Sequence, residues 1–275
     1  MLFSRANVII IKTIKFRCSL SVDKKGEKLR KFKVKTKESL FDKIFGGICK
    51  FFKRKPEFID LNGNPIEKKS IIIGNHNGAG GPFHYRGFMK HRFMTWGAHP
   101  MCEGYISRWK YLYHVFYRQK LHYSKFKSFI IATLFGLIAG VVYRYAAVLP
   151  LYFDKRIMST CRYSFECIEK DVSIFIFPEN SSDGYNEKPL SFHPGFLTFS
   201  KLYYKRKGVD LPVYTLFYKK RPKQIIIGKP MYINELLKTH SEQEVLEIFR
   251  SYMNSLPEEA AIKNIEKKPD MDSVA

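Results

Sequence analysis

The sequence is short of acidic residues. It has 25 Asp and Glu against 48 Lys and Arg, which leaves a formal net charge of +23 in 275 residues. A field this positive attracts anionic polymers and anionic lipid surfaces, and it carries no information about the fold. An acidic membrane and a nucleic acid are the two partners that fit, unless the charge reflects only a generally basic proteome.

The sequence also lacks several signals that define other classes of protein. It has no close CxxC pair, no paired Cys/His spacing, no basic region that runs into heptads and no ribonucleoprotein-type aromatic signature, so no specific nucleic acid partner is expected. Its first residues carry charges through the apolar stretch and lack a small-residue cleavage site, which argues against a secretory signal. The scattered cysteines are then expected to be buried or incidental thiols in a reducing compartment: Cys18, Cys49, Cys102, Cys161 and Cys167.

Hydrophobic and aromatic residues are plentiful. Hydrophobic residues make up 45% of the chain and aromatic residues 16%, which is enough for a substantial core and suits a surface at a lipid headgroup layer. Residues 1–57 form a basic segment whose part 40–53 has the spacing of an amphipathic helix, either resting on an acidic bilayer or docked on the core. Residues 128–143 are uncharged but shorter than the roughly 20 residues of a membrane span. They predict a helix that is buried, dips into the membrane or lines an acyl-chain tunnel, with a true span as the alternative.

Apolar strands alternate with helical segments along the rest of the chain, which predicts the fold class. This order is typical of an α/β domain with a largely parallel sheet flanked by helices, here over residues 58–257, followed by a charged C-terminal tail at 258–275. Residues 58–64 predict a strand followed by a turn, and the further predicted strands are residues 70–74, 147–152, 172–177, 211–218 and 224–227. The predicted helices are 159–170, 194–207 and 242–256.

Two of these strands end in polar residues that could carry chemistry. Asn75 and His76 follow the first strand in a glycine-rich loop, and Pro178 and Glu179 follow a later one. Acyl transfer to a hydroxyl needs a base for the hydroxyl proton and dipoles for the oxyanion. A histidine at a strand end can be that base, and glycines let backbone amides approach a ligand closely. A purely structural histidine in such a loop is the alternative interpretation.

The order of four segments resembles the glycerol-phosphate and lysophospholipid acyltransferase family. The segments are residues 74–82, 149–156, 176–184 and 210–214. The resemblance implies a glycerolipid acyltransferase-like fold and a peripheral or monotopic enzyme on the cytoplasmic face of a membrane, which needs no metal and no cofactor. It implies acyl-CoA or acyl carrier protein as donor, a lysolipid as acceptor and an anionic membrane surface as partner. It also makes His76 the general base and implies substrate-binding roles for Asn75, Lys155, Arg156, Pro178, Glu179 and Asn180.

The chain departs from the family pattern at two places. Gly81 stands where the family has the Asp that orients the histidine, so Glu103 or Asp183 is expected to replace it, or else the site is inactive. The third segment reads Asn-Ser-Ser after Glu179 and lacks the Arg that the resemblance implies for binding the acceptor phosphate. Lys155 or Arg156 could bind this phosphate instead; the alternative is that both belong to a solvated basic turn. A catalytically inactive, lipid-binding relative of the enzymes is the alternative function.

Overall fold

The computed structural model describes most of the chain after residue 53. The described residues are 54–78, 80–154, 156–180 and 184–266, together with isolated positions between 40 and 51. Two predicted site residues, Lys155 and Asp183, lie outside them, as does most of the basic N-terminal segment. At the described positions between 40 and 51 the backbone is helical, and Leu40 and Phe51 are exposed.

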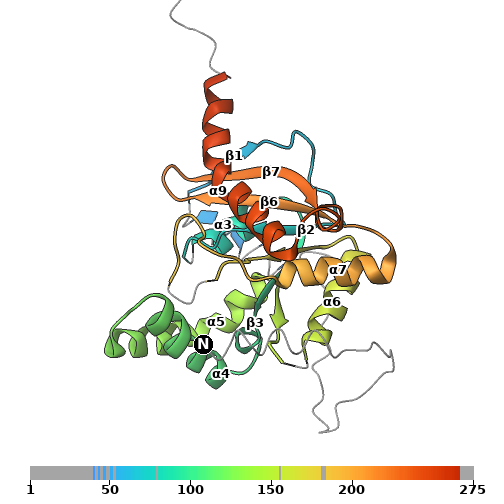
Figure 1. The fold of residues 1–275 in the computed structure, drawn as a ribbon. Coiled ribbons are helices and arrows are strands. Elements are labelled where there is room, and N and C mark those ends of the chain that lie inside the picture. The colour runs from blue at the N-terminus through green and yellow to red at the C-terminus, as the bar shows by residue number, and fades with distance from the viewer. Residues whose placement is uncertain are drawn as a thin grey trace, which may run out of the picture. The chain divides into compact units, whose positions relative to one another are not determined.

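A mixed sheet forms the centre of the described chain (Figure 1). Its 7 strands lie in the order β1-β7-β6-β2-β5-β3-β4. Strands β6, β2, β5, β3 and β4 run parallel to one another, β7 is antiparallel to β6, and β1 is parallel to β7. The predicted α/β fold with a largely parallel sheet is therefore confirmed. The strands are β1 (Glu57–Asp60), β2 (Ile71–Gly74), β3 (Phe93–Ala98), β4 (Val148–Leu151), β5 (Ser173–Ile176), β6 (Pro212–Lys219) and β7 (Gln224–Tyr232).

The two strands that precede the polar motifs are neighbours at the middle of the sheet. Every residue of β2 and β5 is buried, and Ile73 of β2 pairs with Ile176 of β5. Continuous apolar runs of this kind are typical of parallel strands that are covered on both faces. Because the two strands are parallel and in register, the residues that follow them leave the sheet side by side at its carboxyl edge.

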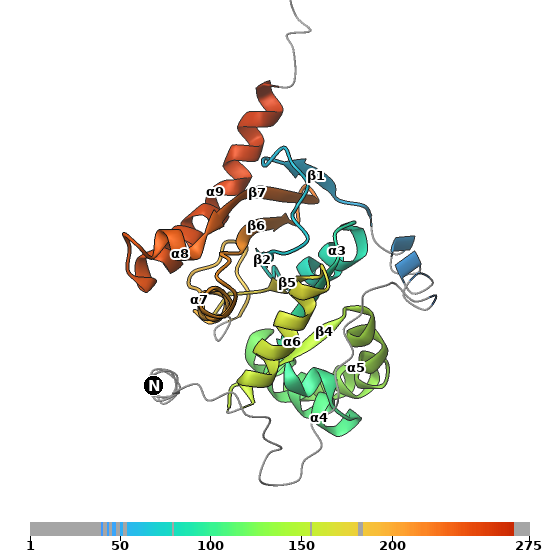
Figure 2. The ribbon, with the colours of Figure 1, turned by 90° about the vertical axis from the view of Figure 1, so that its right-hand side faces the viewer.

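Helices cover both faces of the sheet. Helices α7 and α9 lie on one side and α3 on the other (Figure 2). Helix α9 continues through Pro257, so the predicted end of this helix at residue 256 is wrong; its core face packs on β6 and β7. The bounds of these helices and of two others are α3 (Gly80–Phe88), α6 (Ile157–Glu169), α7 (Gly195–Lys207), α8 (Ile233–Leu236) and α9 (Glu242–Glu266).

A helical excursion joins β3 to β4. It comprises the 3₁₀ turn η1 (His99–Cys102), α4 (Tyr105–Lys110), the π-helical segment η2 (Tyr111–Lys120) and α5 (Lys125–Tyr145). The apolar stretch 128–143 lies within α5, whose 21 residues make a helix about 31 Å long. Within the described part of the chain, α5 alone is long and apolar enough to cross a membrane, judged by length and composition only.

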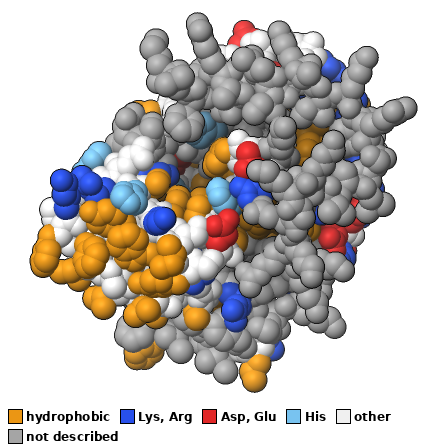
Figure 3. Space-filling view, turned by 90° about the horizontal axis from the view of Figure 1, so that it is seen from below, with side chains coloured by type: hydrophobic (Ala, Val, Ile, Leu, Met, Phe, Trp, Pro, Cys, Tyr) orange, Lys and Arg blue, Asp and Glu red, His pale blue; other side chains and the backbone are white. Residues whose placement is uncertain are grey.

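Helix α5 turns its small residues inward and its large apolar residues outward. Its buried positions are Ser128, Ala132, Gly136, Ala139, Val142 and Tyr145. Its exposed apolar side chains are Phe126, Phe129, Ile130, Leu134, Leu137, Ile138 and Val141. This is the reverse of a helix that packs its large residues into a core. On the side of the molecule where α4 and α5 lie, hydrophobic side chains gather among Lys, Arg and His (Figure 3).

Candidate active site at the carboxyl edge of the sheet

His76 lies in a tight loop directly after β2. Asn77 and Gly78 both have positive φ angles, of 40° and 68°, and together they turn the chain back on itself. Glycine adopts this conformation readily, and asparagine more readily than most other residues. The turn brings the Gly78 carbonyl against the imidazole, where Nδ1 of His76 makes a short hydrogen bond to it.

This hydrogen bond determines the tautomer of His76. A carbonyl oxygen can only accept, so Nδ1 carries the proton and Nε2 keeps the lone pair. No described residue forms a hydrogen bond with Nε2 of His76. The ring is therefore held by one nitrogen, while the other is able to accept a proton from a substrate.

The loop leaves no room for an acid at position 81. A Cβ atom on Gly81 would lie 2.6 Å from the His76 carbonyl oxygen and 2.8 Å from that of Asn75. The amide of Gly81 donates to the same His76 oxygen at 3.1 Å, which fixes the close approach. The backbone carbonyl of Gly78 therefore occupies the orienting position on Nδ1, and the loop conformation that brings it there requires glycine at 81.

Glu179 follows β5 and contacts the His76 loop. Its carboxylate accepts a hydrogen bond of 2.6 Å from the backbone N–H of His76, and the carboxylate is buried. A short backbone bridge to Phe192 supports Glu179 from the other side. Glu179 thus fixes the backbone of the His76 loop, while the imidazole itself is oriented by Gly78.

Burial shifts the protonation of both groups. The pKa of His76 is lowered to about 4, chiefly by desolvation and also by the positive charge of Lys120, whereas the hydrogen bond to the Gly78 carbonyl acts to raise it. Desolvation also raises the pKa of Glu179 to about 7, although the His76 amide and Lys120 both act to lower it. Near neutral pH the imidazole is consequently uncharged, the state that a general base needs.

Residues that the sequence analysis did not name as site residues complete the surroundings of His76. The ring of Tyr185 stacks on the imidazole with centroids 4.3 Å apart, and Phe177 approaches it edge-on at 5.0 Å. Lys120, the last residue of η2, donates to the Tyr185 hydroxyl at 3.5 Å and lies 5.2 Å from the centre of its ring. Desolvation, and then the charge of Lys120, also lower the pKa of His193. Lys120 therefore contributes a positive charge near both His76 and His193.

Asn75, predicted to bind substrate, is part of the scaffold instead. Its side chain is fully buried; Oδ1 accepts from the Tyr218 amide at 2.6 Å and from the Tyr85 hydroxyl at 2.9 Å. Its Nδ2 donates to the Tyr218 carbonyl at 3.0 Å. These bonds occupy the amide and tie the end of β2 to the end of β6, so Asn75 is not available to a substrate.

The other predicted residues around Glu179 contribute mainly through their backbones. The buried Pro178 accepts a hydrogen bond of 2.7 Å from the His193 amide, and the amide of the exposed Asn180 donates to Ser191 at 3.0 Å. His84 of α3 is buried with Nδ1 bonded to the Gly80 carbonyl at 2.7 Å, and its ring stacks on Tyr218. It is a structural histidine.

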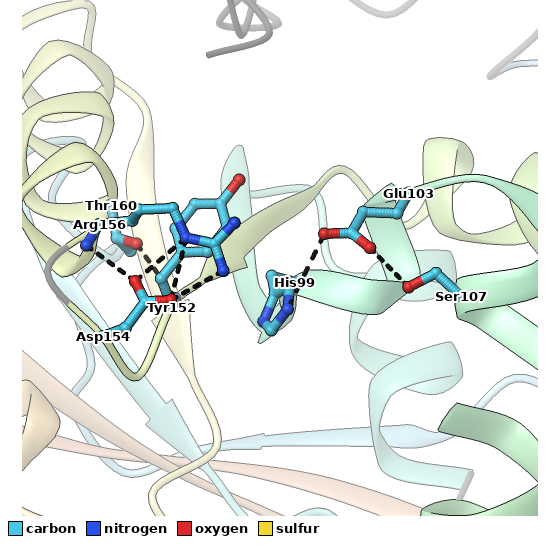
Figure 4. A network of polar contacts seen from close by, with 7 residues as sticks. All are labelled: His99, Glu103, Ser107, Tyr152, Asp154, Arg156 and Thr160. Atoms are coloured by element: carbon cyan, nitrogen blue, oxygen red, sulfur yellow. Dashed lines mark hydrogen bonds and ion pairs between the residues drawn. The ribbon is translucent and has the colours of Figure 1, made fainter. Parts of the chain in front are cut away.

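Glu103 and Arg156 belong to a separate polar network at the ends of β3 and β4 (Figure 4). Glu103 lies 3.8 Å from Nε2 of His99 and accepts from Ser107, whereas Arg156 is paired with Asp154 at 2.8 Å. Strand β3, which leads into Glu103, lies two strand spacings, roughly 10 Å, from β2, and β4, which leads into Arg156, lies three, roughly 14 Å. Glu103 is therefore not the partner of His76, and the guanidinium of Arg156 is engaged by its own neighbour.

Within the described residues no group of His, Cys, Asp and Glu side chains is arranged to hold a metal ion.

The sequence matches no known family model and no curated protein. Among solved structures, the chain is similar to the crystal structure of the 1-acyl-sn-glycerophosphate (LPA) acyltransferase PlsC from Thermotoga maritima. The match has 14% sequence identity and a TM-score of 0.43, and it covers 84% of this chain and 80% of that one. Likeness at this level does not define the activity of this chain.

Proposed function

We propose that this chain is a membrane-surface acyltransferase that moves a fatty acyl group from acyl-CoA or acyl carrier protein to the hydroxyl of a lysophospholipid or related lipid. The observation that carries the proposal is the state of His76. It is uncharged, its tautomer is fixed by Gly78, and it lies beside Glu179 at the carboxyl edge of a parallel sheet. Ligands of open α/β sheets bind at this edge.

In the proposed reaction Nε2 of His76 accepts the proton of the acceptor hydroxyl as its oxygen attacks the thioester carbonyl. The tetrahedral intermediate then collapses, the C–S bond breaks, and the leaving thiolate takes the proton back from Nε2. The enzyme forms no covalent bond to the acyl group, and every proton is returned. General-base catalysis of this kind contributes about 10²- to 10⁴-fold to a rate.

The Gly78 carbonyl performs only part of the work of a carboxylate. It fixes the tautomer and the ring orientation, but a neutral oxygen stabilises the imidazolium less than a charged one does. Glu179 lies close to the loop and Lys120 opposes a positive charge on His76. We therefore expect the enzyme to have a lower rate than one with a His–Asp pair. We assign to Lys120 the role of attracting an anionic acceptor headgroup.

The exposed face of α5 supports the membrane part of the proposal. Contiguous large apolar side chains on a surface are typical of protein or membrane contacts. Cations flank this face, with Lys125 and Lys127 at the start of α5 and Arg144 at its end. An apolar stripe with basic ends suits an anionic bilayer, and we place it at the cytoplasmic leaflet.

A transfer assay tests the proposal. The purified chain is mixed with anionic liposomes, labelled acyl-CoA or acyl carrier protein, and a panel of lysolipids, and the products are separated by mass. We expect a diacyl product from at least one donor and acceptor pair. Absence of product from every pair, with folded and liposome-bound protein, would remove the assignment as an enzyme.

The second candidate function is a lipid-binding relative that has lost the reaction. It is favoured by Gly81, because no carboxylate of a described residue bonds to the His76 ring. This candidate requires liposome binding that His76→Asn leaves unchanged, together with no turnover. Any product that depends on His76 rules it out.

A further inference from the structure

A basic cavity opens at the edge of the sheet where β1 begins and where the β6–β7 hairpin turns. Its volume is about 530 Å³. Five of its lining residues are cationic and one is acidic. The lining consists of Arg54, Lys55, Glu57, Lys220, Arg221, Pro222 and Lys223.

The strand pairing explains why these cations meet. Strand β1 runs parallel to β7, with Glu57 opposite Gln224, so the residues before β1 lie beside the hairpin residues before β7. The Glu57 amide donates to the Lys223 carbonyl at 2.9 Å, and the Glu57 carboxylate accepts from the Gln224 side chain at 2.8 Å. Among the described lining residues, the one acidic group is thus bonded to a neutral amide, and the positive charges around it repel one another unless an anion joins them.

The cavity lies at the same edge of the sheet as His76. The Tyr218 carbonyl, at the end of β6, accepts hydrogen bonds from Asn75 at 3.0 Å and from Asn77 at 3.2 Å. Lys220 follows Tyr218 by two residues, a distance of at most about 7 Å along the chain. A ligand in the cavity would therefore lie beside the loop that carries the proposed base.

We propose that this cavity binds the phosphate-bearing nucleotide end of acyl-CoA and so places the thioester of the donor near His76. The inference rests on the proposed function and selects between its two donors. The volume lies in the range of small-molecule sites, which is about 300–1,000 Å³. Several cations lining one concavity match a compact group with more than one phosphate.

Direct binding of adenosine 3′,5′-bisphosphate, measured by calorimetry, tests the proposal without any turnover. Two double variants change opposite walls of the cavity at exposed positions: Lys220→Gln with Arg221→Gln, and Arg54→Gln with Lys55→Gln. Each is expected to weaken binding at least about tenfold, because two charged contacts to phosphate are lost. In the transfer assay the same variants should raise the KM for acyl-CoA at least tenfold and leave kcat within about twofold.

A matched control separates a local site from the overall charge of the protein. Lys205→Gln with Lys229→Gln removes two exposed lysines that do not line the cavity, with the same change of net charge. This variant is expected to bind adenosine 3′,5′-bisphosphate as the wild type does. Equal weakening in the control and the cavity variants would overturn the proposal, because the effect would then be long-range attraction.

Two further outcomes would also overturn it. The first is unchanged binding of adenosine 3′,5′-bisphosphate in folded cavity variants. The second is that the cavity variants lose binding only to acyl carrier protein or only to vesicles of phosphatidic acid. The cavity would then be a contact for an acidic protein or for a lipid. Failure of the wild type to transfer acyl groups from any donor is a different result, since it removes the proposed function while the calorimetric titration still reports on the cavity.

Discussion

Placing an aspartate at position 81 should destabilise this protein. In Gly81→Asp the new Cβ would lie 2.6 Å from the His76 carbonyl oxygen and 2.8 Å from that of Asn75. Both atoms belong to the backbone, and the His76 oxygen also accepts a hydrogen bond from the amide of residue 81. The loop must therefore open before any side chain fits, and opening it separates Gly78 from the His76 ring.

The size of this effect follows from two contributions. Forcing extra atoms into a packed region costs about 1–3 kcal/mol. Position 81 is buried, so a carboxylate there adds a desolvation cost that rises further if it lacks partners. We expect a loss of at least about 2 kcal/mol in the free energy of unfolding, or a fall of roughly 4–8 °C in Tm for a domain of this size.

Thermal unfolding and acyl transfer should be measured on the same samples. Gly81→Ala should lose stability for the same steric reason, whereas Gly87→Ala provides the control in the same helix. A Cβ on Gly87 meets nothing within 4 Å, and alanine is favoured over glycine in a helix by about 1 kcal/mol. If Gly81→Asp were as stable as the wild type and transferred acyl groups faster, the acid would reach His76 and the orienting role of Gly78 would be refuted.

Three other changes give separate tests of the site and of the membrane face. Burial raises the pKa of Glu179 to about 7 in the folded protein, so the wild type should lose on the order of 3 kcal/mol of stability as pH rises from about 4.5 to 7. Urea unfolding at several pH values should detect this loss in the wild type and not in Glu179→Gln. If the free energy of unfolding had the same pH dependence in the wild type and in Glu179→Gln, the raised pKa of the buried carboxyl would be contradicted. Lys120→Met removes a charge that lowers the pKa of His76, so this pKa, followed by NMR, should rise above about 4; no rise would place Lys120 away from the ring. Replacing the exposed Leu134 and Leu137 by Glu should weaken liposome binding at least tenfold and change stability by less than about 1 kcal/mol, whereas retained binding would exclude α5 as the contact.

The strands that carry the motifs were predictable because each is a short buried apolar run. Residues 70–74 and 172–177 became β2 and β5 with small changes of boundary, and their parallel pairing places His76 beside Glu179. Strand β3 (Phe93–Ala98) was missed, since its sequence mixes Thr and Gly with aromatic residues and has no clear period of two. Helix α9 passes the expected stop at Pro257, where packing on the sheet outweighs the loss of one backbone hydrogen bond.

The site itself was only half predictable. The group that orients His76 is a backbone carbonyl, and every residue has one, so no pattern of residue types could reveal it. Lys120 is one of many cations in a strongly basic chain and lies outside every motif, at the end of η2 within the excursion between β3 and β4. Arg156 follows β4 as expected, but Asp154, two residues earlier, engages its guanidinium. Such partners are determined by the three-dimensional arrangement and by local turns more than by the motif.

The most direct test of the central claim is the initial rate of acyl transfer by the wild type and by His76→Asn, measured with the same donor, acceptor and liposomes. Asparagine can still donate a hydrogen bond toward the Gly78 carbonyl and keep the loop closed, but it cannot accept the hydroxyl proton as a base. The account predicts a rate lower by at least about 10²-fold in the variant, with unfolding and liposome binding unchanged. Equal rates for the two proteins would contradict it.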